Sequence, residues 1–334
     1  MAFAAGRARA SAEGTDSLAA MVHMRIVAPR DRVDGAMQLL CATDSVCNVI
    51  RLSDPATRPD GNVIMCDVAR EDASVVIADL KELDIHHSGS ITLEEIDTAI
   101  SDVAVRAEKH ARGAPADAVV WEEVEARTDE QVELSATFLV FMVLAALIAA
   151  VGIYQDSAIL IVGAMVVGPE FGPIAGFCVA LVQRRRRLAR RSAIALVVGF
   201  PSAIVAVFAA TLAFKATGVV PDDFDQSGHQ FSNIIASPDF LAFFVAACAG
   251  AAGMLSLSTA KSGALIGVLI SVTTIPAAAN IGVTAAYADW ENWRGSIAQL
   301  ALNMGAILVA GTATLAIQRA LYSQRRRRHE AAIG

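Results

Sequence analysis

Six apolar stretches, each about as long as a bilayer-spanning helix, dominate the second part of this 334-residue chain. A helix needs about 20 apolar residues to cross the hydrocarbon core of a membrane. Within these stretches Glu170 carries the only charged side chain. The sequence therefore predicts an α-helical polytopic membrane protein, with six transmembrane helices at residues 134–154, 158–182, 192–214, 240–259, 263–286 and 296–317.

The basic residues between the stretches predict the orientation. Lys and Arg in short loops favour the cytoplasmic side of a membrane. If residues 1–133 are cytoplasmic, twelve basic residues of the later loops and the tail lie inside, and only Lys215 and Arg294 lie outside. We therefore expect both termini in the cytoplasm. The arginine blocks at 184–187 and 325–328 then anchor the chain at anionic membrane lipids, and we expect no nucleic acid partner.

The N-terminal part of the chain alternates strand-like and helix-like segments in the order βαββαβ. The strands show the period-two alternation of a half-buried sheet. This order predicts an α+β ferredoxin-like domain with its helices on one face of the sheet. We expect strands at 22–28, 46–53, 62–69 and 89–97, and helices at 31–42 and 72–83.

These features divide the chain into five segments. The five cysteines form no C-x-x-C pair, so we expect reduced thiols and a cytoplasmic head rather than a disulfide framework. No apolar core of a signal peptide is evident near the start. The predicted segments are a disordered N-terminus at 1–20, the ferredoxin-like cytoplasmic domain at 21–100, a helical linker at 101–133, the transmembrane domain at 134–317 and a basic cytoplasmic tail at 318–334.

One turn of the head partly matches a calcium loop. Asp84 and Glu95 would stand at loop positions 1 and 12, but positions 3 and 5 hold His86 and Ser88, where Asp or Asn is usual. We therefore favour a turn into the last strand. The adjacent His86 and His87 have no third ligand nearby in the sequence and are interpreted as a solvated turn. We predict no metal and no cofactor.

Glu170 lies where two prolines interrupt the second apolar stretch, in the run Gly-Pro-Glu-Phe-Gly-Pro at 168–173. A carboxylate at mid-bilayer costs roughly 2.5–3.5 kcal/mol, so it normally faces a partner, a bundle interior or a water-filled path. The fifth stretch has a similar interruption at Pro276. The predicted transport or ligand site comprises the residues at these two interruptions: Gly168, Pro169, Glu170, Gly172, Pro173, Thr273, Thr274, Pro276 and Asn280.

The two interrupted stretches occupy matching positions in two halves of three helices each. Because three is odd, the second half enters the membrane from the opposite side, which predicts a 3+3 inverted repeat. In many secondary transporters such interrupted helices form the binding site. The alternative is a proline kink repaired by Ser and Thr within a rigid bundle. The small residues Gly168, Gly172 and Gly176 favour close packing of helices or of subunits.

The run at 156–176, the arginine loop after it, the Ile275-Pro276 pair and the acidic turn at 289–293 resemble a bacterial membrane family, the domain of unknown function 389. The resemblance covers most of residues 117–317, and the head is similar to the domain often found before it. At 168–173 the family commonly has Ser-Pro-Leu-Met-Gly-Pro, so Glu170 departs from its pattern. The resemblance implies a multi-pass protein of the bacterial inner membrane, and it implies neither catalytic residues nor a substrate.

Two functions fit these features. The first is a homo-oligomeric transporter or channel for a small solute or ion, in which Glu170 binds a cation or exchanges a proton. The second is a membrane-anchored sensor or scaffold whose head binds a small ligand or a protein partner. An enzyme is not predicted, because the chain has no nucleophile elbow, no set of zinc ligands and no phosphate-binding glycine loop.

Overall fold

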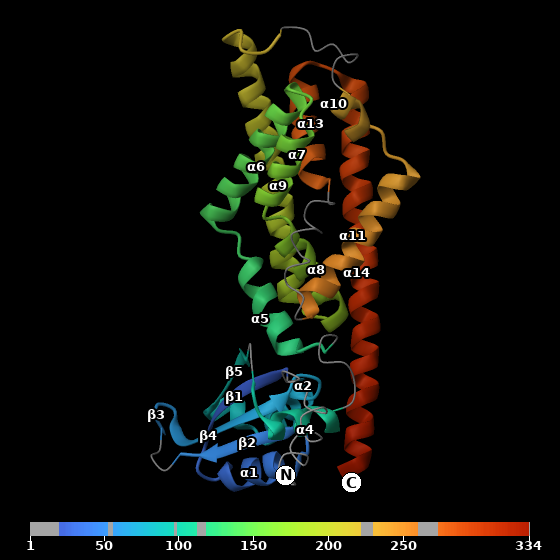
Figure 1. Ribbon diagram of the computed structural model, residues 1–334. Coiled ribbons are helices and arrows are strands. Elements are labelled where there is room, and N and C mark those ends of the chain that lie inside the picture. Colours follow the sequence, from blue (N-terminus) through green and yellow to red (C-terminus); the bar gives the residue numbers. More distant parts are fainter. Residues whose placement is uncertain are drawn as a thin grey trace, which may run out of the picture. The chain divides into compact units, whose positions relative to one another are not determined.

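The computed structural model describes residues 20–52, 56–96, 99–111, 118–221, 230–259 and 273–333. Residues 1–19 of the expected N-terminal segment at 1–20 lie outside these ranges, as does the first part of the fifth stretch, through residue 272. The chain divides into two compact units, Met1–Glu122 and Glu123–Gly334. The strands belong to the first unit and the long helices to the second (Figure 1).

The first unit contains a small antiparallel sheet in the order β2-β4-β1-β5, and a short strand β3 pairs with β4. Strand β1 pairs with β4 along its full length, with Met24 opposite Cys66. A two-residue strand before β4 was not expected from the sequence. The strands are β1 (Met21–Ala28), β2 (Val46–Arg51), β3 (Ala56–Thr57), β4 (Asp60–Ala69) and β5 (Ser90–Ile96).

One face of this sheet forms the core of the unit. Alternate residues of β1, including Val22, Met24 and Ile26, are buried against helices α1 (Val33–Ala42) and α2 (Ala73–Glu82). This is the period-two pattern that the sequence showed in the strands. A single turn of helix, α3 (Ile85–Ser88), comes between α2 and β5.

A fourth helix, α4 (Asp102–His110), lies in the segment expected to be a linker. Its side chains Ala104 and Ala107 join Met21, Cys47 and Ala69 in a second, smaller cluster on the other side of the sheet. Ser101 caps this helix, because its hydroxyl oxygen accepts from the backbone of Ala104. The segment after residue 100 therefore contributes packing to the head.

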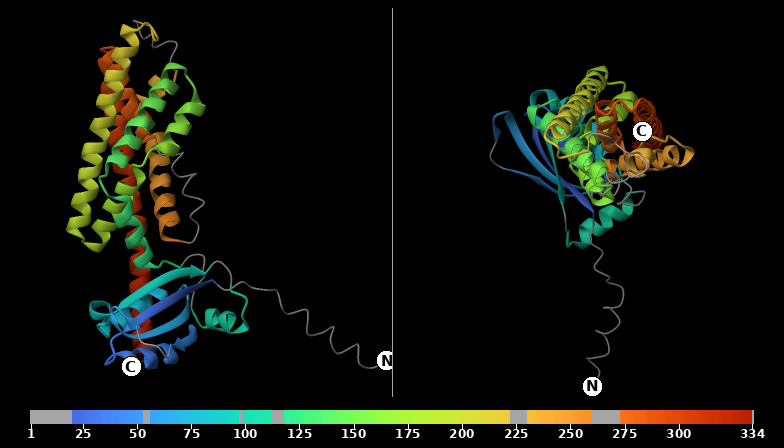
Figure 2. Two further views of the ribbon diagram at one scale, coloured as in Figure 1. Left: turned by 90° about the vertical axis from the view of Figure 1, so that its left-hand side faces the viewer. Right: turned by 90° about the horizontal axis from the view of Figure 1, so that it is seen from above.

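The second unit is a bundle of long apolar helices (Figure 2). Four of its helices are long and apolar enough to span a membrane, and α7 with α8 form a fifth candidate bent by 52°. The helices are α6 (Ala136–Tyr154), α7 (Ala158–Val167), α8 (Phe171–Gln183), α9 (Arg186–Ala216), α10 (Gln230–Ile235), α11 (Phe240–Ser258), α13 (Thr274–Ala286) and α14 (Trp290–Ile333), preceded by α5 (Trp121–Gln131).

Half of the buried residues in the core of this bundle are alanines, which allow close helix packing. Alanines of α6 and α13 pack there with Met142, Ile153 and Ile275. Large apolar side chains instead cover the outer surface, including Val197 and Val205 of α9 and Val309 of α14. Apolar residues on the outside and small residues within are the distribution expected of a protein surrounded by lipid.

Four of the six expected spans correspond to α6, α9, α11 and α14, and the second corresponds to the bent pair of α7 and α8. Of the expected fifth span, the described residues contain only the 13-residue helix α13. The structure thus shows four or five membrane-length spans within its described ranges.

Candidate functional site

The second apolar stretch is divided at Gly168, where α7 ends and the chain turns before α8 begins. Glu170 is the N-cap residue of α8, and its carbonyl oxygen accepts from the backbone of Ile174. Pro169 lies in the turn, and Pro173 is the third residue of α8. The first amide groups of a helix have no intrahelical acceptor, so a proline there removes no helical hydrogen bond.

Helix α13 begins in the same manner. Thr273 is its N-cap, Pro276 is its third residue, and the backbone of Ala277 donates to the carbonyl oxygen of Thr273. Pro173 and Pro276 thus stand in the first turn of a new helix. In these positions neither proline removes a hydrogen bond from the interior of its helix.

The side chain of Glu170 connects the two helix starts. Thr274 Oγ1 donates to Glu170 Oε1 at 2.9 Å. The residue is only 2% exposed, and its Oε2 atom has no hydrogen-bond partner among the described residues. A carboxyl group can accept several hydrogen bonds, so the described residues leave one oxygen of this buried group without a donor.

Gly168 provides the space for this carboxyl group. A Cβ atom at position 168 would overlap Glu170 Oε2 and would approach a side-chain carbon of Ile275 at 2.8 Å. Residues Gly168, Glu170 and Thr274 are therefore brought together as the sequence suggested. Their role in transport stays a prediction.

Two further polar residues, both on α14, lie in this region. They were not among the site residues predicted from the sequence. Asn303 Nδ2 donates to Thr273 Oγ1 at 2.6 Å, and Gln299 Nε2 donates to Asn303 Oδ1 at 3.1 Å. Both side chains are buried. Their spacing of four residues places them on one face of the helix, and this signal was available in the sixth apolar stretch.

Asn280 belongs to a different cluster. Its side-chain amide donates to the carbonyl oxygen of Ser232 and to Ser296 Oγ, and its Oδ1 atom accepts from Ser232 Oγ. Both hydrogens of the Asn280 amide nitrogen and the amide oxygen are thus hydrogen-bonded within this cluster. It lies seven residues beyond Thr273, about 10 Å along a helix. The structure therefore places Asn280 outside the polar group around Glu170.

The glycines of α8 contact the end of the connecting helix. A Cβ atom at Gly172 would approach the backbone oxygen of Gln131 at 2.9 Å, and one at Gly176 would overlap Val132. Further along, Arg185 donates to Asp129 Oδ2 at 3.0 Å. These two glycines thus allow α5 and the residue after it to pack closely on α8.

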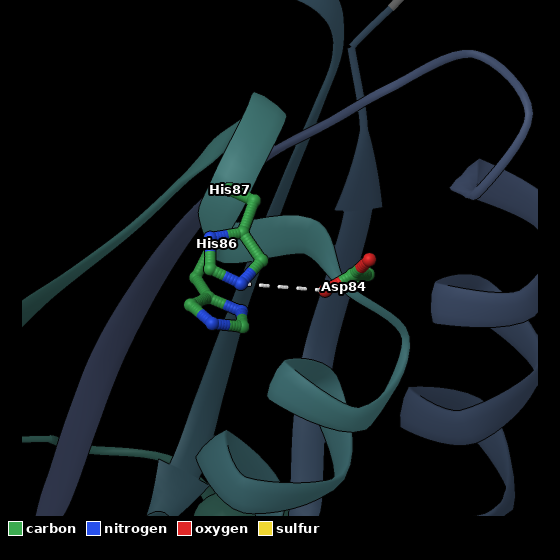
Figure 3. A group of neighbouring side chains, drawn as sticks. All are labelled: Asp84, His86 and His87. Carbon is green, nitrogen blue, oxygen red and sulfur yellow. Dashed lines mark ion pairs between the residues drawn. The ribbon is translucent and has the colours of Figure 1, made fainter.

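The turn at Asp84 differs in form from a calcium loop. Residues of the matched segment form α3 and β5, and Glu95 lies in β5, where it pairs with Arg70 at 2.8 Å. Asp84, His86 and His87 do form an exposed group whose ligand atoms lie within 4.8 Å of one another (Figure 3). Asp84, two positions before His86, supplies the third side chain that was not counted with the two histidines in the sequence, and His87 Nε2 lies 3.6 Å from its Oδ1 atom.

Residues 165–309 match the family described as a domain of unknown function (DUF389). This part of the chain belongs to the DUF389 family. The DUF389 region contains Glu170, Thr274, Asn303 and Gln299, so the whole polar group lies within it.

The chain is also similar to an uncharacterized protein from Methanocaldococcus jannaschii. The two are 25% identical over 189 residues, which is 57% of this chain and 56% of that protein. The match thus spans just over half the length of this relative. No solved structure matches the chain.

Proposed function

We propose that this protein is an integral membrane transporter or channel for a small solute or ion, with Glu170 on the substrate path. The observation that carries the proposal is the buried carboxyl group with one oxygen bound by Thr274 and the other without a partner among the described residues. Buried polar atoms are normally hydrogen-bonded, and an exception calls for an explanation. A ligand or a proton that occupies the site transiently supplies one.

The architecture supports this proposal. We assign six spans, in which the bent α7 and α8 form the second and α13 is the later part of the fifth. The first turns of α8 and α13 both contain a proline at the third position, which is consistent with a 3+3 inverted repeat. We further propose a homo-oligomer in the inner membrane, in contact with its lipids, with both termini cytoplasmic.

We assign the head to the ferredoxin-like fold. Its strand order β2-β4-β1-β5 and the two helices on one face support this assignment. In the proposed function the head is a cytoplasmic regulatory domain.

Ion flux in proteoliposomes tests the proposal. With proton and cation gradients imposed, wild-type protein should carry flux, and Glu170→Gln should alter its pH dependence while fold and assembly stay unchanged. Asp239→Asn is the matched control, because Asp239 is an exposed carboxylate that caps α11. Equal flux in wild type and a folded Glu170→Gln variant would remove Glu170 from the mechanism.

A second function, a membrane-anchored sensor or scaffold, draws support from the head. On the face of the sheet opposite α1 and α2, His23 Nδ1 lies 2.7 Å from Asp67 Oδ1, and Asn48 donates to Asp67 Oδ2 at 2.7 Å. Such an ordered polar group on a partly open face could hold a small ligand. Wild-type protein that carries no flux for any tested ion would favour this second function.

A further inference from the structure

The exposed group at the turn between α2 and β5 combines two kinds of side chain that bind divalent transition metals. Asp84 precedes the short helix α3, to which His86 and His87 belong. One carboxylate oxygen and one nitrogen of each imidazole lie within 4.8 Å of one another (Figure 3). Among the residues that the structure describes, no other set of three His, Cys, Asp or Glu side chains meets this condition.

The spacing of these atoms is closer to that of metal ligands than to that of a hydrogen bond. His87 Nε2 lies 3.6 Å from Asp84 Oδ1, beyond the about 2.7–3.2 Å of an N–H···O hydrogen bond. Two ligand atoms of a tetrahedral zinc ion, each at about 2.0–2.1 Å from the metal, are about 3.3 Å apart. The rings of His86 and His87 have their centroids 4.0 Å apart. Rotation of these exposed side chains can therefore bring all three ligand atoms to the spacing of a metal site.

The three side chains are also available for a ligand. In the described part of the chain, their only polar or ring interactions are the His87–Asp84 pair and the contact between the two imidazoles. The other described histidines have partners of their own: His23 bonds to a carboxylate, and His110 bonds to a backbone carbonyl oxygen. A metal ion at the turn would thus displace no hydrogen bond of the head.

The core of the head fixes the backbone that carries these side chains. Ile85, between Asp84 and His86, is fully buried in that core. The amide of Gly89 donates to the carbonyl oxygen of Ile85 at 2.7 Å, and a Cβ atom at position 89 would overlap the backbone oxygen of Val27 in β1. Because the turn is already held against β1, a bound ion would have little backbone to order, which favours its binding.

We propose that Asp84, His86 and His87 form a site on the head for a divalent transition-metal ion of the zinc, nickel and copper group. Imidazole suits these ions, whereas calcium and magnesium take oxygen ligands. Three protein ligands leave a further coordination position for water. The site lies just before the edge strand β5, so an ion that binds only the folded head should stabilise it. This inference goes beyond the proposed function, because it requires no transport at Glu170.

Isothermal titration calorimetry and thermal unfolding of the untagged full chain in detergent test this inference. The exposed cysteines, Cys41 and Cys248, are replaced by serine so that their thiolates cannot bind the metal. Zinc chloride should bind at one saturable site per chain and should raise the melting temperature. Calcium chloride and magnesium chloride, at the same ionic strength, should do neither.

Three substitutions remove the ligands one at a time from exposed positions. His86→Ala, His87→Ala and Asp84→Gly should each lower the apparent affinity for zinc at least tenfold and reduce the rise in melting temperature. Glycine is used at position 84 because its φ of 62° disfavours alanine. His110→Ala is the matched control, since His110 is an exposed histidine of α4, and it should leave the affinity unchanged.

The outcomes decide the site independently of transport. Unchanged zinc affinity in a folded variant that carries both His86→Ala and His87→Ala would overturn the inference, as would calcium stabilisation equal to that of zinc. A loss of affinity in His110→Ala as large as that in His87→Ala would also contradict it. Each of these results would leave the transport proposal intact, because that proposal is tested by the flux of Glu170→Gln.

Discussion

Thr274 and Glu170 are 104 positions apart in the chain, yet the threonine hydroxyl donates to the carboxyl group at 2.9 Å. Each residue belongs to the start of a helix that begins within the membrane-spanning unit. A single hydrogen bond thus connects two helix starts that the sequence had related only by their prolines. The other carboxyl oxygen has no hydrogen-bond partner among the described residues, and this is the basis of the proposed function.

Removal of the Thr274 hydroxyl group, which donates to Glu170, should destabilise the protein. Thr274→Val keeps the shape of the side chain but removes the hydroxyl that donates to Glu170 Oε1, which should lower the free energy of unfolding by about 1–3 kcal/mol. Thr274→Ser should retain most of the stability. Denaturant titration in detergent measures both, with Thr217→Val as a control, because the Thr217 hydroxyl donates only to carbonyl oxygens of its own helix. Equal stability of the Thr274→Val variant and wild type would show that the bond contributes nothing.

A paired substitution on α7 tests the space around the carboxyl group. Gly168→Ala should be destabilising by about 1–3 kcal/mol, because the new methyl group would displace Glu170 Oε2 or Ile275. Gly163→Ala on the same helix meets no atom within 4 Å, so it should be neutral or stabilising through helix propensity. Thermal unfolding compares the two variants. Similar melting temperatures for both would contradict the packing seen at Gly168.

Much of the architecture could be predicted because its signals are local. Apolar length predicted the helices α6, α9, α11 and α14, and period-two alternation predicted the strands of the head. The short strand β3 was missed, since two paired residues give no periodicity. Helix α4 lies within the expected helical linker, but its packing against the sheet was not predicted, because it packs through small alanines rather than large apolar side chains.

The site was predictable only in part, because contacts between helices leave no local signal in the sequence. An isolated carboxylate between prolines indicated Glu170, and a nearby Thr-Thr pair indicated its partner. Whether a polar residue on α13 faces Glu170 depends on tertiary packing, and Asn280 faces Ser232 and Ser296 instead. Gln299 and Asn303 were not predicted, because their apolar stretch contains no proline and the site was inferred from proline interruptions.

Thiol labelling at two positions of α14 tests the orientation of the membrane unit. Glu291 and Ser323 are exposed positions near opposite ends of this helix, about 48 Å apart at the usual helical rise. In a chain without native cysteines, a thiol at 291 should react with a membrane-impermeant reagent in intact cells, and one at 323 should react only after lysis. The reverse pattern would contradict the cytoplasmic placement of the C-terminus.

The thiol of Cys66 gives a pH-dependent test of the head. Burial within β4, together with the charge of Asp67, raises the pKa of Cys66 to about 12. An unfolded cysteine has a pKa of about 8.5, so the unfolded chain loses this proton first as pH rises. The stabilising contribution of the neutral thiol is therefore fully present below pH 8.5 and decreases as pH rises toward 12.

Alkylation of single-cysteine variants measures this difference. At pH 8 a chain that retains only Cys41, which is exposed, should react rapidly with iodoacetamide. A chain that retains only Cys66 should react at this pH no faster than the head unfolds. Since the neutral thiol stabilises the fold, Cys66→Ala should also flatten the loss of stability between pH 9 and 10.5. Rapid alkylation of Cys66 in folded protein would show that the thiol is accessible and that β4 is not buried in the core of the head.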